Sequence, residues 1–125
     1  MFAIEDLVPG TSFGAQLDEN VGPVMVLNIF TFPAGKSDAF VETWTAAAET
    51  MKKQPGFISA QLRRAVGNDE AVVNLAVWES TEALKNAVQS DDALKAHEWE
   101  LEGVVARPLL LESTGPMIAP DKEQE

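Results

Sequence analysis

The sequence contains no cysteine and no tyrosine among its 125 residues. Without cysteine the chain has no disulfide framework, no thiol nucleophile and no thiolate metal site, which fits a reducing cytoplasm. Without tyrosine, no phenol is present to donate a proton during catalysis. Covalent chemistry at a thiol and acid catalysis by a phenol are therefore both excluded.

Histidines and phosphate-binding motifs are also scarce. The sequence has a single histidine, His97, whereas metal sites built on imidazole use several ligands that lie close together. The segment Gly35-Lys36-Ser37 lacks the upstream glycine of a nucleotide-binding P-loop. We therefore expect the purified protein to hold no metal, flavin or haem.

Basic residues are few, since nine Lys and Arg stand against twenty Asp and Glu, and the net charge is −11 at pH 7. This charge repels phosphate backbones and anionic lipid surfaces, so neither nucleic acid nor a membrane is an expected partner. No segment approaches the ~20 apolar residues that cross a bilayer. The first residues lack the basic and apolar regions of a signal peptide, so we expect a cytoplasmic protein. A neutral aromatic ligand is favoured over a polyanionic one.

Hydrophobic periodicity divides the chain into three parts. Residues 1–22 contain one proline and three glycines without sustained periodicity, and we expect them to form an N-terminal arm that packs on the domain or on a partner subunit. Residues 23–113 are expected to form one domain, and residues 114–125 a C-terminal tail. The strands expected within the domain span residues 24–32, 57–66, 71–78 and 104–112.

Three serines are expected to begin the helices between these strands: Ser37, Ser80 and Ser90. The helix after Ser90 is expected to end at Gly103. The first helix carries an apolar stripe that we assign to the core, namely Phe40, Trp44, Ala47, Ala48 and Met51. The resulting order predicts an α+β, ferredoxin-like β-α-β-β-α-β protomer with an antiparallel sheet. Pro108, within the last strand, indicates an edge position or a bulge.

The first strand of the domain is apolar on both of its faces. Its alternate residues are Met25, Leu27 and Ile29 on one face and Val24, Val26, Phe30 and Phe32 on the other. Helices cover one face of a ferredoxin-like sheet, so a sheet that is apolar on both faces needs a second cover. We expect a homodimer that packs sheet to sheet to supply it.

The segment 71–78 is the most informative strand of the sequence, because its two faces differ in chemistry. One face consists of branched aliphatic residues, which we expect to pack on the helices: Val73, Leu75 and Val77. The other face carries Val72, Asn74, Ala76 and Trp78. A wall with an amide and an indole suits a flat ring system with polar edges.

Asn74, Trp78 and Asn28 are therefore the candidate site. Asn28 has a similar apolar setting on its own strand, and ligand pockets are apolar cavities with a few convergent polar groups. The ordinary alternative is a packing pair whose amide bonds to neighbouring backbone. We expect the substrate pocket to be lined by Val26, Phe30 and Ala76.

His97 shares a helical face with Leu94 and Leu101. One interpretation is a half-buried histidine with a hydrogen-bonded ring. A general base or an axial haem ligand are the alternatives that the sequence leaves open. A Ser-His-Asp triad is not indicated, because no nucleophile motif accompanies the histidine.

Three motifs together resemble the antibiotic biosynthesis monooxygenase domains of the dimeric α/β-barrel superfamily. They are Asn-Ile-Phe-Thr-Phe-Pro-Ala-Gly at 28–35, Lys-Gln-Pro-Gly-Phe at 53–57 and Val-Asn-Leu-Ala-Val-Trp-Glu-Ser at 73–80. Within that family, the chain is similar to the cofactor-independent oxygenases that convert anthrones to anthraquinones in aromatic polyketide pathways. This resemblance implies that Asn28, Asn74 and Trp78 are the active-site positions. It also implies a small aromatic substrate, a dimeric barrel, and molecular oxygen as the co-substrate without a cofactor.

The resemblance extends to the IsdG-type haem-degrading monooxygenases, which share the first-strand asparagine, the setting of Trp78 and a histidine placed like His97. Those enzymes carry a helix tryptophan that ruffles the haem, and the matching position here is Ala87. This departure, together with Asn74, favours the quinone-forming activity. A non-catalytic module that binds a small molecule is the third alternative.

Overall fold

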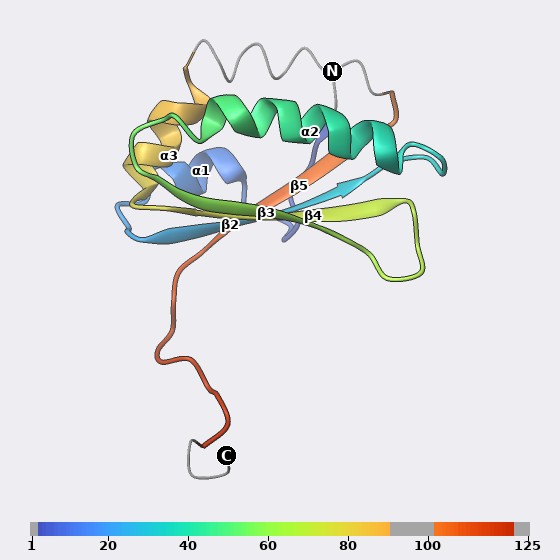
Figure 1. Cartoon of the computed structure of the whole chain (residues 1–125). Coiled ribbons are helices and arrows are strands. Elements are labelled where there is room, and N and C mark those ends of the chain that lie inside the picture. Colours follow the sequence, from blue (N-terminus) through green and yellow to red (C-terminus); the bar gives the residue numbers. More distant parts are fainter. Residues whose placement is uncertain (1–2, 91–101, 122–125) are drawn as a thin grey trace.

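The computed structural model describes residues 3–90 and 102–121 of the chain. In chain order its elements are β1 (Ala3–Ile4), α1 (Phe13–Leu17), β2 (Val24–Thr31), α2 (Ser37–Met51), β3 (Phe57–Arg64), β4 (Ala71–Trp78), α3 (Thr81–Val88) and β5 (Val105–Leu111). From β2 to β5 they follow the ferredoxin-like order, so the predicted α+β fold class is confirmed (Figure 1). Within these ranges, no helix is long and apolar enough to cross a membrane.

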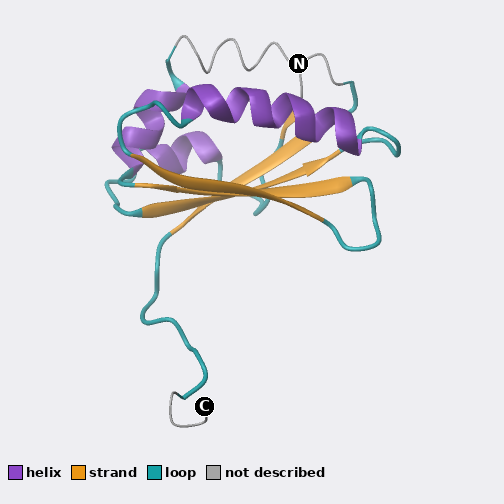
Figure 2. Cartoon of the chain, in the orientation of Figure 1, coloured by secondary structure: helices purple, strands orange, loops and turns teal. Residues whose placement is uncertain are grey.

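The strands form one sheet of five, in the order β1-β5-β2-β4-β3. From β5 to β3 each neighbouring pair is antiparallel, and β1 adds to the outer side of β5 in parallel. The helices lie on one side of this sheet (Figure 2). One face of the sheet is therefore covered, and the other has no cover from the described part of the chain.

The hairpin of β3 and β4 agrees with the strands predicted over 57–66 and 71–78. Gly67, in the turn between them, has a φ of 71°, a left-handed conformation that glycine adopts without steric cost. The Asn68 side chain accepts a hydrogen bond of 2.7 Å from the backbone N–H of Glu70 and so closes the turn. The predicted hairpin is confirmed.

The start of α2 differs from the prediction. Ser37 lies inside the helix rather than at its N-cap, because the backbone N–H of Phe40 already donates to the carbonyl of Lys36 at 2.9 Å. Lys36 is the N-cap residue and makes no capping hydrogen bond with its side chain. Asp38 does lie in the first turn, where a carboxylate interacts favourably with the helix dipole.

The start of α3 agrees with the prediction. The Ser80 hydroxyl accepts a hydrogen bond of 3.0 Å from the backbone N–H of Ala83, as an N-cap residue does. The helix predicted from Ser90 to Gly103 falls mainly on residues 91–101, outside the described residues.

Two hydrophobic clusters form the core between the sheet and the helices. The first consists of Leu17, Val24, Val26, Ala76, Trp78, Leu84 and Ala87. The second consists of Phe30, Phe32, Phe40, Val72, Val104 and Ala106. On β2 and β4 the residues of this face that separate the clusters are Asn28 and Asn74. Two amides thus occupy the middle of an otherwise apolar layer.

The face of β4 that packs beneath the helices is the opposite of the one predicted. The residues expected to contact the helices, Val73, Leu75 and Val77, are only partly buried in the single chain. Val72, Ala76 and Trp78 belong to the two core clusters instead. Strand alternation fixes which residues share a face, but it does not say which of two apolar faces the helices cover.

The uncovered face of the sheet is apolar at its centre. Its residues on the three inner strands include Met25, Leu27, Ile29, Val73, Leu75, Val77, Leu109 and Leu111. Met25 is 37% exposed, and the others are partly buried. After β5 the chain leaves the sheet on this uncovered side (Figure 1). The predicted second cover is therefore not supplied by the described residues of a single chain.

Pro108 occupies an edge position, as predicted. β1 pairs with β5 only at Val105 and Ala106, so its pairing has ended before Pro108 is reached. The backbone of Leu110, two residues further along, points away from β2 towards α1. By strand alternation the Pro108 nitrogen points the same way, so its missing N–H removes no hydrogen bond from the ladder.

Candidate functional site

A cavity of about 380 Å³ lies between the covered face of the sheet and the helices. The sheet contributes Val26, Asn28, Phe57, Ala60, Asn74, Ala76, Trp78, Ala106 and Pro108. The helices and the N-terminal segment contribute Ile4, Phe13, Leu17, Trp44, Ala48, Met51, Leu84 and Val88. The lining is apolar except for two amides and two indole N–H groups, a composition typical of small-molecule sites.

Asn28 and Asn74 lie directly opposite each other, as register partners on β2 and β4. Such partners in an antiparallel ladder have Cα atoms about 5 Å apart and side chains on the same face. Both side chains line the cavity. The structure therefore brings together two asparagines that are 46 positions apart in the sequence, counting from 28 to 74.

The Oδ1 atoms of Asn28 and Asn74 are both buried and have no hydrogen-bond partner. Buried side-chain polar atoms in folded proteins nearly always have one, and leaving one unsatisfied costs about 1–3 kcal/mol. In the structure, therefore, neither oxygen accepts a hydrogen bond from neighbouring backbone, which was the ordinary alternative to a ligand site. A ligand with hydroxyl or N–H groups would satisfy them.

Trp78 lies four residues beyond Asn74 on the same face of β4 and is 2% exposed. Its ring makes an edge contact with Phe57, with the ring centroids 5.3 Å apart and the planes at 85°. This contact orients the indole while part of it lines the cavity. The three predicted site residues thus share one cavity wall.

The expected pocket residues are only partly where the sequence placed them. Val26 and Ala76 line the cavity, as expected. Phe30 instead packs in the second core cluster, with its ring centroid 4.8 Å from that of Phe40. The reason is that Phe30 lies beyond Asn28 on β2, at the end of the sheet where Phe40 fills the space.

α2 contributes cavity residues that the sequence assigned to the core. Trp44, Ala48 and Met51 line the cavity, whereas Phe40 of the same stripe is completely buried. The helical spacing correctly identified the inward face of α2. Spacing alone does not distinguish a side chain packed against the sheet from one that faces a cavity.

The N-terminal segment contributes walls that sequence analysis missed. Ile4 of β1 and Phe13 and Leu17 of α1 line the cavity. The available signal was Ser12, whose hydroxyl accepts a hydrogen bond of 3.1 Å from the backbone N–H of Ala15 and begins α1. A helix of only one turn leaves too little periodicity to be recognised.

The described cavity lining contains no ionisable side chain. The possible base or pocket residue His97 lies outside the described residues. Within residues 3–90 and 102–121, no three His, Asp or Glu side chains are grouped so that they could hold a metal ion. The chemistry available in the described lining is therefore that of neutral donors and acceptors.

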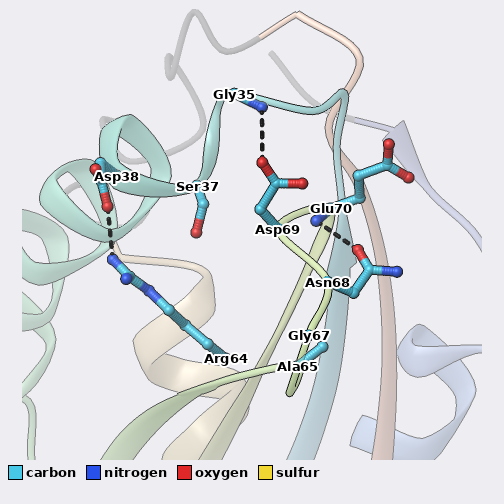
Figure 3. Close-up of a pocket in the computed structure, with 9 residues that line it drawn as sticks. All are labelled: Gly35, Ser37, Asp38, Arg64, Ala65, Gly67, Asn68, Asp69 and Glu70. Atoms are coloured by element: carbon cyan, nitrogen blue, oxygen red, sulfur yellow. Dashed lines mark hydrogen bonds and ion pairs between the residues drawn. The ribbon is translucent and has the colours of Figure 1, made fainter.

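A second depression, of about 690 Å³, lies at the end of the sheet where the β3–β4 turn meets the start of α2 (Figure 3). Three of its four charged side chains are paired with each other or with backbone. Arg64 contacts Asp38 at 2.8 Å, and Asp69 accepts from the backbone N–H of Gly35 at 3.3 Å. Both ion-pair partners are largely exposed, so the depression is an open polar surface that has little binding energy to offer.

Comparisons with known proteins identify relatives of this chain and of its fold. The curated haem oxygenase (mycobilin-producing) of Mycobacterium tuberculosis is 32% identical over 84 residues, which cover 67% of this chain and 79% of the relative. The crystal structure of SnoaB, a cofactor-independent oxygenase from Streptomyces nogalater, is similar with a TM-score of 0.71 and 24% identity, over 78% of this chain and 98% of that one.

A structure of a substituted MhuD with two manganese protoporphyrin IX molecules per active site is also similar. Its TM-score is 0.63 and its identity 26%, over 78% of this chain and 100% of that one. The sequence model of the antibiotic biosynthesis monooxygenases matches residues 23–99. The resemblance of the motifs and the prediction of an oxidoreductase are thus confirmed at the level of the family. The chain belongs to the antibiotic biosynthesis monooxygenase family.

Proposed function

We propose that the protein oxidises an anthrone-like polycyclic phenol to a quinone with molecular oxygen and without a cofactor. The observation that carries this proposal is the pair of buried, unpartnered Oδ1 atoms of Asn28 and Asn74, whose side-chain amides line an apolar cavity next to Trp78. In a cavity that excludes water, neutral hydrogen-bond donors stabilise a developing oxyanion without forming an ion pair with it. The fold shared with a cofactor-independent oxygenase supports the same activity.

The chemistry explains why neutral groups suffice. Deprotonation of the methylene carbon of an anthrone gives an aromatic enolate, which is electron-rich enough to transfer one electron to O₂. The substrate radical and superoxide combine to form a C–O bond, and protonation gives a hydroperoxide. Loss of water from that hydroperoxide leaves the quinone carbonyl. One O₂ is consumed, one oxygen atom enters the product and the other leaves as water.

Each site residue has a role in this reaction. The amide N–H groups of Asn28 and Asn74 donate to the enolate oxygen, and their Oδ1 atoms accept from phenolic hydroxyls. Trp78 offers a ring face for stacking and an N–H donor. Val26 and Ala76 complete the pocket wall and exclude water, which strengthens these hydrogen bonds. Removal of one oxyanion donor typically raises the barrier by about 3 kcal/mol.

The described lining holds no base for the proton of the methylene group. We propose that His97 or water takes this proton. His97 is the single histidine of the sequence, and its unperturbed pKa makes it suitable as a base near neutral pH. With the enolate stabilised by two amides, water or hydroxide is a sufficient acceptor for an acidic anthrone.

Haem degradation is the second candidate, and the curated haem oxygenase with 32% identity favours it. Haem would then be the substrate, with His97 as the candidate axial ligand. Titration with hemin distinguishes the two. A tight Soret band that His97→Ala abolishes, without oxidation of any anthrone, would support haem degradation in place of our proposal.

We also propose that the protein is a homodimer. The uncovered sheet face is apolar at its centre, and exposed apolar surface of this kind marks an interface between subunits. A second copy packed sheet to sheet would cover it and close the dimeric α/β barrel. Sedimentation of a species larger than 13.5 kDa at micromolar concentration is expected.

The decisive experiment is incubation with dithranol in air, with O₂ uptake and quinone absorbance followed together. Wild type should consume one O₂ per quinone formed, and Asn28→Ala and Asn74→Ala should be severely impaired. Asn20→Ala is the matched control, because Asn20 is exposed and does not line the cavity. Binding of dithranol without O₂ uptake would instead support the non-catalytic binding module.

A further inference from the structure

The segment before residue 23 builds one wall of the cavity, although the family match begins only at residue 23. β1 places Ile4 at the cavity, and α1 places Phe13 and Leu17 there. Leu17 is also part of the first core cluster. This chain therefore carries a cavity wall that lies outside the part it shares with the family model.

Gln16 attaches α1 to the edge of the sheet. Its Nε2 donates to the carbonyl of Leu110 at 3.1 Å, and the N–H of Leu110 donates to its Oε1 at 2.9 Å. The side-chain amide thus bonds to β5 as the peptide group of a neighbouring strand would, beyond the point where β1 ends. Phe13 lies three residues earlier, one helical turn away, so this attachment holds the turn of helix that carries the Phe13 ring.

Thr81, at the start of α3, attaches the other end of the segment. Its hydroxyl donates to the carbonyl of Glu19 and accepts from the backbone N–H of Val21 at 3.2 Å, and its own N–H donates to the carbonyl of Val21 at 2.8 Å. Thr81 is 3% exposed, so these bonds are shielded from water. β1 pairs with β5 at the start of the segment, Gln16 bonds to β5, and Thr81 bonds near the end of the segment, so the segment forms a fixed wall.

We infer that residues 3–22 form a fixed cap on the substrate cavity and that Phe13 is the residue that limits how many fused rings the substrate can have. Phe13 is the aromatic side chain that the cap contributes, and the sheet and α2 contribute the other aromatic walls, Phe57, Trp78 and Trp44. A rigid phenyl wall contacts the edge or face of a flat ring system. The inference rests on the proposed function for its substrate class.

The test measures binding without turnover, by calorimetry under argon. The probes are dithranol, with three fused rings, and a tetracenone, with four. Phe13→Ala removes the ring and should shift the ratio of the two dissociation constants about tenfold in favour of the tetracenone. Phe13→Trp should shift it in the opposite direction, which keeps the inference testable if either variant fails to fold.

Val8→Ala is the matched control, because Val8 belongs to the same segment but is 45% exposed and does not line the cavity. It should leave the ratio unchanged, and an equal shift in this control would overturn the inference. An unchanged ratio in both Phe13 variants would also overturn it. If the ratio shifts but no variant consumes O₂ in air, the proposed oxidation fails and the cap inference stands. If dithranol is oxidised but the ratio does not shift, the cap inference fails alone.

Discussion

Asn28 and Asn74 face each other across the central strands of the sheet, and neither amide oxygen has a hydrogen-bond partner. They separate two hydrophobic clusters, at positions where apolar side chains would stabilise the fold more. A local choice that lowers stability at a cavity wall is typical of residues kept for function. The pair therefore makes the most direct test of the site.

Asn74→Leu should raise the stability of the fold while it lowers the activity. Leucine has the same number and branching of side-chain heavy atoms as asparagine and leaves no unsatisfied oxygen, so we expect the free energy of unfolding to rise by about 1 kcal/mol. Turnover of dithranol should fall by about 100-fold, because an oxyanion donor is lost. Urea unfolding and O₂ uptake measure the two effects. A less stable variant with normal turnover would show that the amide is structural.

Trp78→Phe separates the two roles of the indole. Phenylalanine keeps a ring against Phe57, whose centroid lies 5.3 Å from that of Trp78, but it has no N–H. We expect turnover to fall by about tenfold, the effect of losing one hydrogen bond to a charged group, with little change in substrate affinity. Trp44→Phe is the control on the opposite wall. Equal losses in both variants would mean that only ring volume matters.

His97→Ala tests the source of the base. Because the proposed reaction stabilises the enolate with Asn28 and Asn74 and lets water or hydroxide accept the proton, we expect this variant to keep moderate activity near pH 7 and to gain activity as the pH rises and hydroxide ionises the substrate. At high pH it should exceed Asn74→Leu in turnover. A rate that stays the lowest of all variants at every pH would identify direct deprotonation by His97.

Thr81→Val should destabilise the fold without changing the cavity lining. The valine keeps the shape of threonine but removes the hydroxyl that bonds to Glu19 and Val21. The carbonyl of Glu19 and the N–H of Val21 each lose a hydrogen bond to the buried Thr81 side chain, so the free energy of unfolding should fall by about 1–3 kcal/mol in urea titrations. Thr81→Ser keeps the hydroxyl and should retain most of the stability. Equal losses in the two variants would assign the effect to packing of the methyl group.

Leu75→Glu should convert the proposed homodimer to a monomer. Leu75 lies on the uncovered face of β4, opposite Gln61 on β3, and a carboxylate there would be desolvated in a sheet-to-sheet interface. Sedimentation equilibrium should then give a mass near 13.5 kDa. Gln61→Glu adds the same charge at an exposed edge position and should remain dimeric. A dimer that survives Leu75→Glu would place the interface elsewhere.

The sequence predicted the elements of the domain well, because their signals are local. β4 was predicted at its observed limits of 71–78, since strict alternation ends in turn residues on both sides. The side of the sheet that carries the helices was predicted wrongly. Both faces are apolar, and local pattern holds no information on which one receives a helix and which one a partner.

The site residues that lie on strands could be predicted from the sequence. Those that reach the cavity through contacts between residues far apart in the sequence could not. Asn28, Asn74 and Trp78 share a wall because strand alternation and pairing place them there. Phe13 could not be foreseen as a wall, because α1 reaches the cavity through the bonds of Gln16 to Leu110, which is 94 residues further along the chain. No local sequence pattern near either residue indicates such a contact.

The positions of Trp44 and Trp78 on two walls of one cavity give the protein a built-in optical reporter. The sequence has three tryptophans and no tyrosine, so its indole fluorescence is not overlapped by tyrosine emission. A quinone bound between the two walls accepts excitation energy from both indole rings and so quenches their fluorescence. Product formation and product release can therefore be followed in real time with the unlabelled protein. The tryptophan fluorescence should fall as the quinone accumulates in the cavity and rise again as the quinone leaves.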